Sequence, residues 1–309
     1  MRIFSKFLFL ALIILGSISC NQQQEQKKVK VDIKPGFEKY ILGFTSGDQL
    51  SRATTFTIRF QQSVNDSIVE GQEVEKEVFE INPSVKGKAV WINSRSIEFI
   101  PNEPLKSATI YTIKFHLSNF MDVPKENAVL EYQIRTINQD YQYIEKGFDA
   151  YDNNVTLLKY EGKIITADLA NDENVEAMIE AQFADKKQSI VWKHEPGGRV
   201  HHFTVDSLER KEDAQKLLLQ INGKSIGVNR KEEFTLKVPG LKDFEVLSVQ
   251  AYNRKSQYVE IVFSDLIQAN QNLRGLIYFD QYRDVTFIID NNKIKVFPSK
   301  KLTGENNIH

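Results

Sequence analysis

The sequence predicts an all-β protein made of tandem β-sandwiches, the last of them incomplete. Apolar and polar side chains alternate over residues 56–60, 110–117 and 130–137, which is the period of a strand with one buried face. These stretches are rich in β-branched and aromatic residues, and strand centres recur every ~8–12 residues, as in a sandwich. Two segments far apart in the chain also resemble each other, which indicates repeated modules.

The first twenty residues are predicted to be an export signal rather than part of the fold. Arg2 and Lys6 are basic, residues 7–15 are an unbroken apolar run, and mostly small residues lead to Cys20. The apolar run is far shorter than the ~20 residues that a membrane-spanning helix needs. A basic start, a short apolar run and small residues before a cleavage point are typical of a secretory signal peptide.

Cys20 is the only cysteine of the chain. Its surroundings resemble the lipobox of bacterial lipoproteins, in which the cysteine is acylated and becomes the mature N-terminus. Ser17 stands where the lipobox usually has Leu, and an ordinary cleaved signal with a chance cysteine is the alternative. We expect lipid attachment at Cys20, because several acyl chains together make a stable anchor.

Residues 21–37 are expected to be a flexible tether, because the stretch 21–30 is rich in Gln and Lys and has almost nothing to bury. Asn21 follows the cysteine, and no acidic run comes after it. By resemblance to known lipoprotein sorting rules, this pattern predicts a chain that is lipid-anchored to the bacterial outer membrane and faces the periplasm.

Three modules are predicted after the tether. They are an immunoglobulin-like β-sandwich over residues 38–137, a macroglobulin-like β-sandwich over residues 138–241 and a second immunoglobulin-like repeat over residues 242–309. The first and third modules align at a constant offset of 197 residues. This offset pairs Ile92 with Ile289, Ile97 with Ile294, Pro101 with Pro298, Leu105 with Leu302 and Tyr111 with Ile308.

The third module is expected to lack about two strands, because two more strands follow Tyr111 in the first copy but His309 follows Ile308 directly in the second. We therefore expect the chain to be an N-terminal fragment of a longer protein. The alternative is that the missing strands come from a partner or are not needed. Residues 242–309 are expected to be the least stable part, since missing strands leave open edges and an uncovered core face. The side chains expected to lack cover are Val259, Ile261, Phe263, Ile294 and Val296.

The middle module is predicted to contain strands near residues 157–160, 163–167, 189–193, 200–205, 216–221 and 233–238. Gly197-Gly198 predicts a hairpin turn between two of them. Residues 174–183 are the one predicted helix, because apolar side chains stand there at helical spacing, with Asp172 or Asn174 as the N-cap.

Composition and motifs exclude several function classes. The formal net charge is −1, without the basic patch of a nucleic-acid-binding protein. A single cysteine leaves no disulfide framework. The sequence lacks a G-x-S-x-G elbow, a Gly-rich phosphate loop and an H-E-x-x-H motif. We therefore expect no enzyme activity, no catalytic residues and no cofactor.

Three sets of residues have a functional alternative to a structural role. His194 and His201 could be cross-strand neighbours, but His202 would point away, and two ligands do not make a zinc site. We therefore expect no metal site and solvent-facing histidines. Asp280, Asp284 and residues 290–292 could offer oxygen ligands to calcium but lack a known calcium spacing. Trp91 and Trp192 are expected in the core, with carbohydrate stacking as the alternative.

The pattern of the outer modules resembles a known family. The residues that carry the resemblance are Gly43-Phe44-Thr45, Ser51-Arg52, Pro83, Lys86-Gly87, Trp91, Phe99-Ile100-Pro101, Pro104-Leu105, Tyr111, Phe263-Ser264, Gly275-Leu276-Ile277, Pro298, Leu302 and Gly304. Over roughly residues 37–308 the chain is similar to the N-terminal region of bacterial alpha-2-macroglobulin lipoproteins, particularly those of Bacteroidetes-like bacteria. In that family many macroglobulin-like sandwiches are stacked, and cleavage of a bait region traps a protease.

The resemblance implies a scaffold function for this chain. It has no Cys-x-Glu-Gln thioester motif and no recognisable bait region. We therefore expect it to be the membrane-anchored N-terminal scaffold of a periplasmic protease-trapping inhibitor. Its expected partners are the membrane, target proteases of the full-length protein and other envelope proteins, and no nucleic acid. The alternative is a stand-alone immunoglobulin-like adhesion or glycan-binding lipoprotein.

Overall fold

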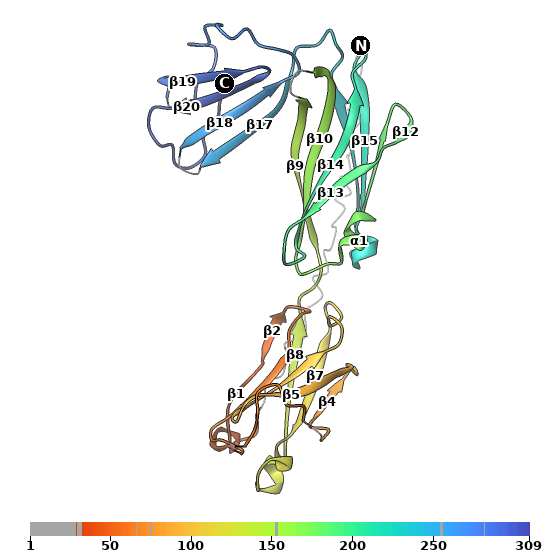
Figure 1. The fold of residues 1–309 in the computed structure, drawn as a ribbon, viewed down its shortest axis with the longest axis vertical. Coiled ribbons are helices and arrows are strands. Elements are labelled where there is room, and N and C mark those ends of the chain that lie inside the picture. Colours follow the sequence, from red (N-terminus) through yellow and green to blue (C-terminus); the bar gives the residue numbers. More distant parts are fainter. Residues whose placement is uncertain are drawn as a thin grey trace, which may run out of the picture.

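The computed structural model describes residue 29 and residues 33–65, 67–74, 76–151, 154–253, 256–280 and 282–309. Cys20, the signal segment and most of the predicted tether lie outside these residues. The described residues form five four-stranded sheets, which confirms the predicted all-β class. Two β-sandwiches, modules 1 and 2, stand end to end, and a single sheet, module 3, lies beside the far end of module 2 (Figure 1).

Module 1 packs the sheet β1-β3-β6-β5 against the sheet β2-β8-β7-β4. Strand β2 runs parallel to β8, and the other paired strands are antiparallel. The strands are β1 (Ile41–Phe44), β2 (Gly47–Leu50), β3 (Phe56–Phe60), β4 (Phe79–Asn82), β5 (Gly87–Asn93), β6 (Ser96–Pro101), β7 (Ile110–His116) and β8 (Val129–Thr136). Three short 3-10 helices join them, namely η1 (Phe37–Lys39), η2 (Leu117–Asn119) and η3 (Lys125–Asn127).

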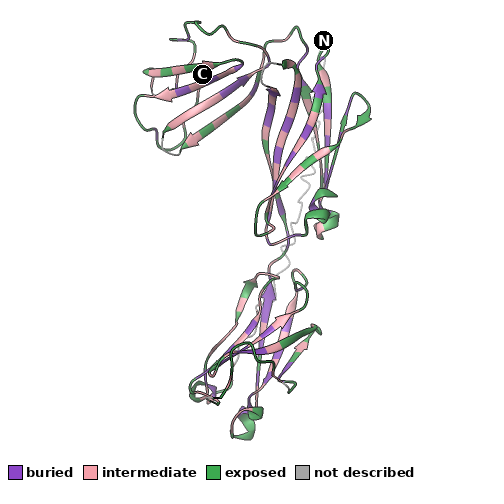
Figure 2. Ribbon diagram, in the orientation of Figure 1, coloured by how far each residue is buried: buried purple, intermediate pink, exposed green. Residues whose placement is uncertain are grey.

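Alternation along each strand builds the core of module 1. In β7, Tyr111, Ile113 and Phe115 are buried, and the residues between them are half-buried. Figure 2 shows the same alternation of buried and more exposed positions along the strands. Burying one such side chain stabilises the fold by about 1.5–3 kcal/mol, so the period of two drives each strand to present one face inward.

Module 2 packs the sheet β13-β14-β10-β9 against the sheet β12-β11-β15-β16. Two predicted strands, near residues 157–160 and 163–167, are one continuous strand, and the long strand before it was not predicted. The strands are β9 (Tyr141–Tyr151), β10 (Asn154–Thr166), β11 (Ile179–Phe183), β12 (Lys186–Lys187), β13 (Ile190–His194), β14 (Val200–Glu209), β15 (Gln215–Asn222) and β16 (Lys231–Val238). A 3-10 helix, η4 (Gly223–Ile226), lies between β15 and β16.

The predicted helix over residues 174–183 is wrong in extent. A short α-helix, α1 (Asp172–Glu176), overlaps only the start of this segment and is capped by the Asn171 side chain, which accepts a hydrogen bond from the Asn174 N–H. The rest of the segment is β11, whose alternating Ile179, Ala181 and Phe183 are buried against the sandwich. The apolar spacing of this segment fits both periods, and pairing with β15 decides for the strand. No helix among the residues described here is long and apolar enough to cross a membrane.

Module 3 repeats one sheet of module 1. Its strands are β17 (Val246–Asn253), β18 (Gln257–Phe263), β19 (Val285–Asp290) and β20 (Lys293–Pro298), in the order β17-β18-β20-β19. This order matches β1-β3-β6-β5, and β20 lies 197 residues after β6 at both ends. The match extends to a hydrogen bond, because the N–H of Phe60 donates to the Arg95 carbonyl and that of Phe263 donates to the Asn292 carbonyl, each at 2.8 Å.

The sheet of module 3 has no second sheet against it in the described part of the chain, but its core face is covered. The expectation that Ile261, Ile294 and Val296 lack cover is wrong, since all three are buried. Leu273 and Phe279, from the irregular segment between β18 and β19, pack against this face together with Leu302 from the segment after β20. Irregular chain here provides the apolar contacts that a second sheet provides in module 1.

Candidate functional site

Modules 1 and 2 meet at a buried carboxylate. Asp168 follows β10, and the residue is only 3% exposed. Its Oδ1 accepts a hydrogen bond from Ser51 Oγ at 2.8 Å, and its Oδ2 accepts one from the Arg52 N–H at 2.6 Å. The Leu169 N–H also donates to Oδ1, at 2.8 Å. A buried carboxylate needs such donors, so the chain after β2 of module 1 is held against module 2.

Gln139 supports this carboxylate from the chain between β8 and β9. Its Oε1 accepts a hydrogen bond from the Asp168 N–H at 3.0 Å, and its amide group donates to the carbonyls of Asp168 and Leu169, each at 3.2 Å. The Gln139 N–H donates to Ser107 Oγ of module 1 at 2.7 Å. We call Ser51, Gln139 and Asp168 the Asp168 joint, because their bonds cross from one module to the other.

Modules 2 and 3 meet at a buried guanidinium. The side chain of Arg210, which directly follows β14, is 0% exposed. It donates to both oxygens of Asp265, at 3.2 and 3.1 Å, and thereby forms a bidentate ion pair across the module boundary. It also donates to five carbonyls, those of Val155, Pro239, Gly240, Asp243 and Ser264. We call Arg210, Asp265 and these five carbonyls the Arg210 joint. The planar guanidinium presents its five N–H donors in a fixed geometry, which the ammonium group of lysine cannot reproduce.

Strand β9 gives module 3 a second contact with module 2. Lys293 Nζ of β20 lies 3.0 Å from Asp149 Oδ1 of β9. The Gln250 amide of β17 donates to the Lys146 carbonyl at 3.2 Å. Gly147 lies between them at φ +94°, and a Cβ there would come within 2.8 Å of Ser248. Module 3 is therefore fixed to module 2 at two places.

One group of metal-ligating side chains occurs among the described residues, Asp172, His194 and His201. Cross-strand pairing of β13 with β14 sets His194 opposite His201, and their Nδ1 atoms are 2.7 Å apart. Asp172, at the start of α1, brings its Oδ1 to 3.4 Å from the His194 Nδ1 and 3.6 Å from the His201 Nδ1. A helix and two strands therefore converge on one point, which we call the His–Asp cluster.

His201 is the buried member of the His–Asp cluster. His201 is fully buried, and this burial lowers its pKa, with a further lowering from the neighbouring His194. The ring of His201 is therefore neutral at pH 7. Its Nε2 has no hydrogen-bond partner among the residues that the structure describes, although an unsatisfied buried polar atom costs about 1–3 kcal/mol. The Nε2 of His194 lies 3.1 Å from Glu176 Oε1, which orients that ring.

The sequence prediction for the histidines was correct in part. His194 and His201 are neighbours, and His202 lies on the other face of β14, where its Nε2 is 2.7 Å from Glu195 Oε1 and lowers the pKa of that carboxyl. The expectation of solvent-facing histidines is wrong for His201. Asp172 was considered only as a helix cap, because nothing in its local sequence shows that the loop after β10 returns to this hairpin.

The two tryptophans lie in different surroundings. Trp91 is 7% exposed and packs edge-on against Phe120 within the core of module 1. Trp192 is half-buried in β13, stacks on His194 and contacts Phe203. It also lines a shallow surface hollow, so only Trp192 is placed to stack on a carbohydrate.

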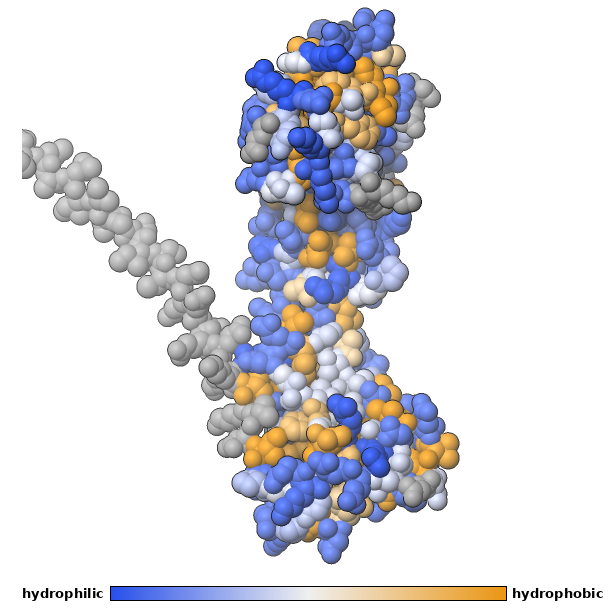
Figure 3. Space-filling model, turned by 90° about the vertical axis from the view of Figure 1, so that its left-hand side faces the viewer, coloured by the Kyte–Doolittle hydropathy of each residue, from blue (hydrophilic) through white to orange (hydrophobic). Residues whose placement is uncertain are grey.

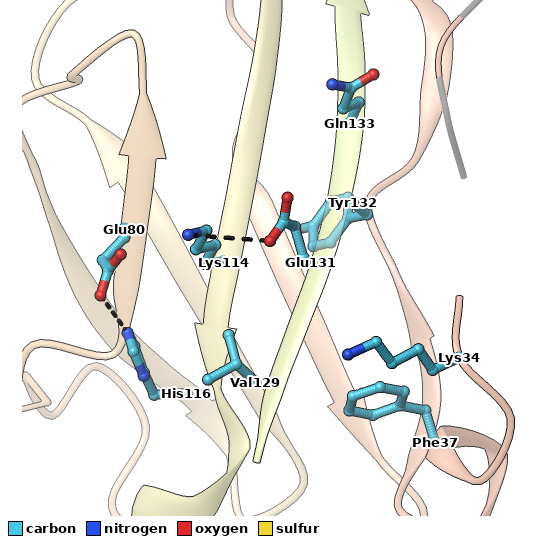
Figure 4. A pocket seen from close by; sticks show the side chains of 9 residues that line it. All are labelled: Lys34, Phe37, Glu80, Lys114, His116, Val129, Glu131, Tyr132 and Gln133. Atoms are coloured by element: carbon cyan, nitrogen blue, oxygen red, sulfur yellow. Dashed lines mark hydrogen bonds and ion pairs between the residues drawn. The ribbon is translucent and has the colours of Figure 1, made fainter. Parts of the chain in front are cut away.

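A hollow of about 540 Å³ lies on the outer face of β4, β7 and β8 (Figure 4). Four of the titratable groups that line it are in contact in pairs, with His116 Nε2 2.7 Å from Glu80 Oε1 and Lys114 Nζ 3.9 Å from Glu131 Oε2. Lys34 and Phe37 border it from the N-terminal side. The lining residues include no serine, threonine or cysteine.

The remaining sequence candidates do not come together. Asp280 accepts hydrogen bonds from Asn307 and His309, which lower the pKa of its carboxyl. The Asn292 amide donates to the Phe263 carbonyl at 2.7 Å. None of the acidic residues considered for calcium belongs to a metal-ligating group within the part of the chain that the structure describes.

No protein-family model and no curated protein matches the sequence. Among solved structures, the chain is similar to the crystal structure of the N-terminal eight Ig domains of Down Syndrome Cell Adhesion Molecule (DSCAM) isoform 1.30.30. That match has 9% sequence identity and a TM-score of 0.18, and it covers 84% of this chain and 38% of that chain. The chain thus spans less than half the length of the matched structure.

Proposed function

We propose that this chain is the membrane-anchored N-terminal scaffold of a protease-trapping inhibitor similar to alpha-2-macroglobulin, placed on the periplasmic face of a bacterial outer membrane. The observation that supports the proposal most is the pair of buried polar joints. They connect successive β-modules through Asp168 and Arg210, so neighbouring modules keep a fixed relation. A scaffold that carries a trap away from a membrane needs such joints, because free hinges would leave the position of the trap undefined.

The resemblance of the outer modules to the alpha-2-macroglobulin lipoproteins gives the proposal its specific class. On the face drawn in Figure 3, hydrophobic residues occur in patches interrupted by hydrophilic ones. The proposed lipid anchor rests on Cys20 alone.

The anchor is tested by substitution of Cys20. Cys20→Ser is expected to leave the protein exported but without lipid label, since only the thiol accepts the diacylglyceryl group. Cells are grown with an alkyne analogue of palmitate, and the labelled protein is detected after coupling to a dye. Gln22→Ser is the control and should label like the wild type. Label that persists in Cys20→Ser would disprove lipid attachment at this residue.

The trapping function is tested in native outer-membrane preparations. A protease added to them should keep its activity on a short peptide but lose activity on a large protein substrate, because a trapped protease remains reachable only by small molecules. The protease should also co-purify with this chain. Preparations from a deletion strain should not protect the protein substrate. Equal protection with and without the chain would contradict the proposal.

A glycan-binding lipoprotein is the second candidate, and the half-exposed position of Trp192 in a surface hollow that Lys146, Glu161 and His202 also line favours it. Trp192→Ala should then abolish binding on a glycan array while circular dichroism stays unchanged. Trp91 is not a useful probe of binding, since it is buried in a core. Absence of binding by the wild-type chain would eliminate this candidate.

A further inference from the structure

We propose that Asp172, His194 and His201 form a binding site for a divalent transition-metal ion, with Zn²⁺ as the expected ion. The site lies in module 2, at the end that faces module 1, where α1 is located (Figure 1). The proposal does not depend on the proposed function, because it rests only on the His–Asp cluster.

The distances between the three ligand atoms fit one ion. They are 2.7 Å between the two Nδ1 atoms and 3.4 and 3.6 Å from these atoms to Asp172 Oδ1. Ligand atoms of a tetrahedral zinc ion with bonds of ~2.1 Å lie about 3.4 Å apart. Only the histidine pair has to open, and His194 can move because its side chain is partly exposed. A water molecule would take the fourth position.

The surroundings prepare His194 as a ligand. Glu176 Oε1 is positioned to accept a hydrogen bond from the Nε2–H of His194, which leaves a free lone pair on the Nδ1 that faces the site. Such a carboxylate behind a ligating histidine is typical of zinc sites. With His194 in this tautomer, His201 Nδ1 would be the donor of the hydrogen bond between the two rings. A metal ion on His201 Nδ1 requires the proton of the neutral ring to lie on Nε2 instead, where the described residues offer no acceptor.

The type of ligand selects the type of ion. Imidazole nitrogens suit zinc and its neighbours in the first transition row, whereas calcium and magnesium prefer sites made only of oxygen. Two neutral histidines and one carboxylate leave a net charge of +1 with a divalent ion. Glu176 reduces this charge further, so an ion with strong nitrogen affinity is favoured over a hard cation.

The ion would fasten the loop after β10 to the hairpin of β13 and β14. Asp172 lies four residues after Asp168, so the same segment carries one ligand of the site and the carboxylate of the Asp168 joint. Without the ion, the contacts of these three residues with one another and with Glu176, within the described part of the chain, are the hydrogen bond between the histidines and polar contacts of the histidines with exposed carboxylates. Metal binding is therefore expected to stiffen the segment that holds module 1 to module 2.

The site is tested by titration of the full chain with Zn²⁺, in a Cys20→Ser background that removes the thiol as a competing ligand. After treatment with EDTA, calorimetry should show one ion bound per chain. Co²⁺ should give the visible absorption of a tetrahedral complex. Hydrogen exchange at residues 167–176 should slow when Zn²⁺ is added. Asp172→Asn and His194→Gln change partly exposed groups and should each weaken binding at least tenfold.

Two further variants complete the test. Glu176→Gln, behind the ligand His194, should weaken Zn²⁺ binding by about 10–100-fold. His202→Ala is the matched control, since this neighbouring histidine points away from the site, and it should bind Zn²⁺ like the parent chain. Circular dichroism checks that each variant is folded. The proposal would be overturned by a parent chain without bound Zn²⁺, by unchanged affinity in Asp172→Asn and His194→Gln, or by equal loss in His202→Ala.

Discussion

Replacement of Arg210 by Met is expected to release module 3 from module 2. The substitution keeps a long apolar side chain but removes the guanidinium, whose five N–H groups make the ion pair with Asp265 and the bonds to five carbonyls. Four of those carbonyls belong to the chain on either side of the module boundary, so the substitution leaves the boundary itself with unsatisfied acceptors.

The expected loss follows from the burial of this ion pair. The Arg210 side chain is fully buried, and removal of one partner from a buried pair costs about 3–5 kcal/mol. Since about 1.4 kcal/mol corresponds to a factor of ten, the open form of the boundary should become roughly a hundred to several thousand times more populated. Arg210→Lys keeps the charge but loses the fork, so its effect should be intermediate.

Limited proteolysis with chymotrypsin measures this opening. Phe244 is exposed and lies in the boundary, so cleavage there should become much faster in Arg210→Met and leave a resistant product that contains modules 1 and 2. Calorimetry should show a separate transition at lower temperature. The control is Lys211→Met, because Lys211 Nζ pairs only with the exposed Glu209, and such a pair contributes about 0–1 kcal/mol. Unchanged cleavage in Arg210→Met, or equal cleavage in Lys211→Met, would refute the reasoning.

Three other outcomes are expected. Asp168→Ala leaves the Arg52 N–H unpaired, so it should lower the free energy of unfolding by about 3 kcal/mol in chemical denaturation and change the small-angle scattering profile. The control Asp213→Ala, at an exposed residue, should change neither quantity. Ile294 is 1% exposed, so Ile294→Ala should lower the free energy of unfolding by about 2–5 kcal/mol. Ile288 is 55% exposed, so Ile288→Ala should lower it by about 0.5 kcal/mol or less. Equal losses would contradict a covered core in module 3. Burial raises the pKa of Tyr143 to about 12 and that of its hydrogen-bond partner Tyr160 still higher, so absorbance titration should find both un-ionised at pH 11. Because the unfolded tyrosines ionise near pH 10, the contribution of these two tyrosines to stability should be constant below that pH and fall above it.

Local sequence determined the strands and the repeat. Alternation of buried and exposed residues is a property of neighbouring positions, so β3, β7 and β8 could be predicted from the residues themselves. The offset of 197 residues likewise predicted the correspondence of β6 with β20. Pairing of His194 with His201 was also within reach, because a glycine turn sets cross-strand neighbours opposite each other.

The secondary structure of residues 179–183 could not be predicted from the local sequence pattern alone. Ile179, Ala181 and Phe183 fit a strand, and Val175, Met178, Ile179 and Phe183 fit a helix, so the segment has no single preferred period. Hydrogen bonds to β15 decide the outcome, and that strand lies about forty residues further along the chain.

Only the tertiary structure decided the joints, the cover of module 3 and the third member of the His–Asp cluster. Arg210, Asp168 and Asp172 look in sequence like ordinary solvated charges, yet two of them are buried and the third faces two histidines. A single charged residue has no periodicity that could reveal its burial. Its surroundings come from segments such as residues 51–52 and 264–265, which are brought to it only after the sheets have formed. Sequence therefore specified the strands through short-range alternation, whereas the polar contacts between modules depend on long-range packing that short-range patterns do not encode.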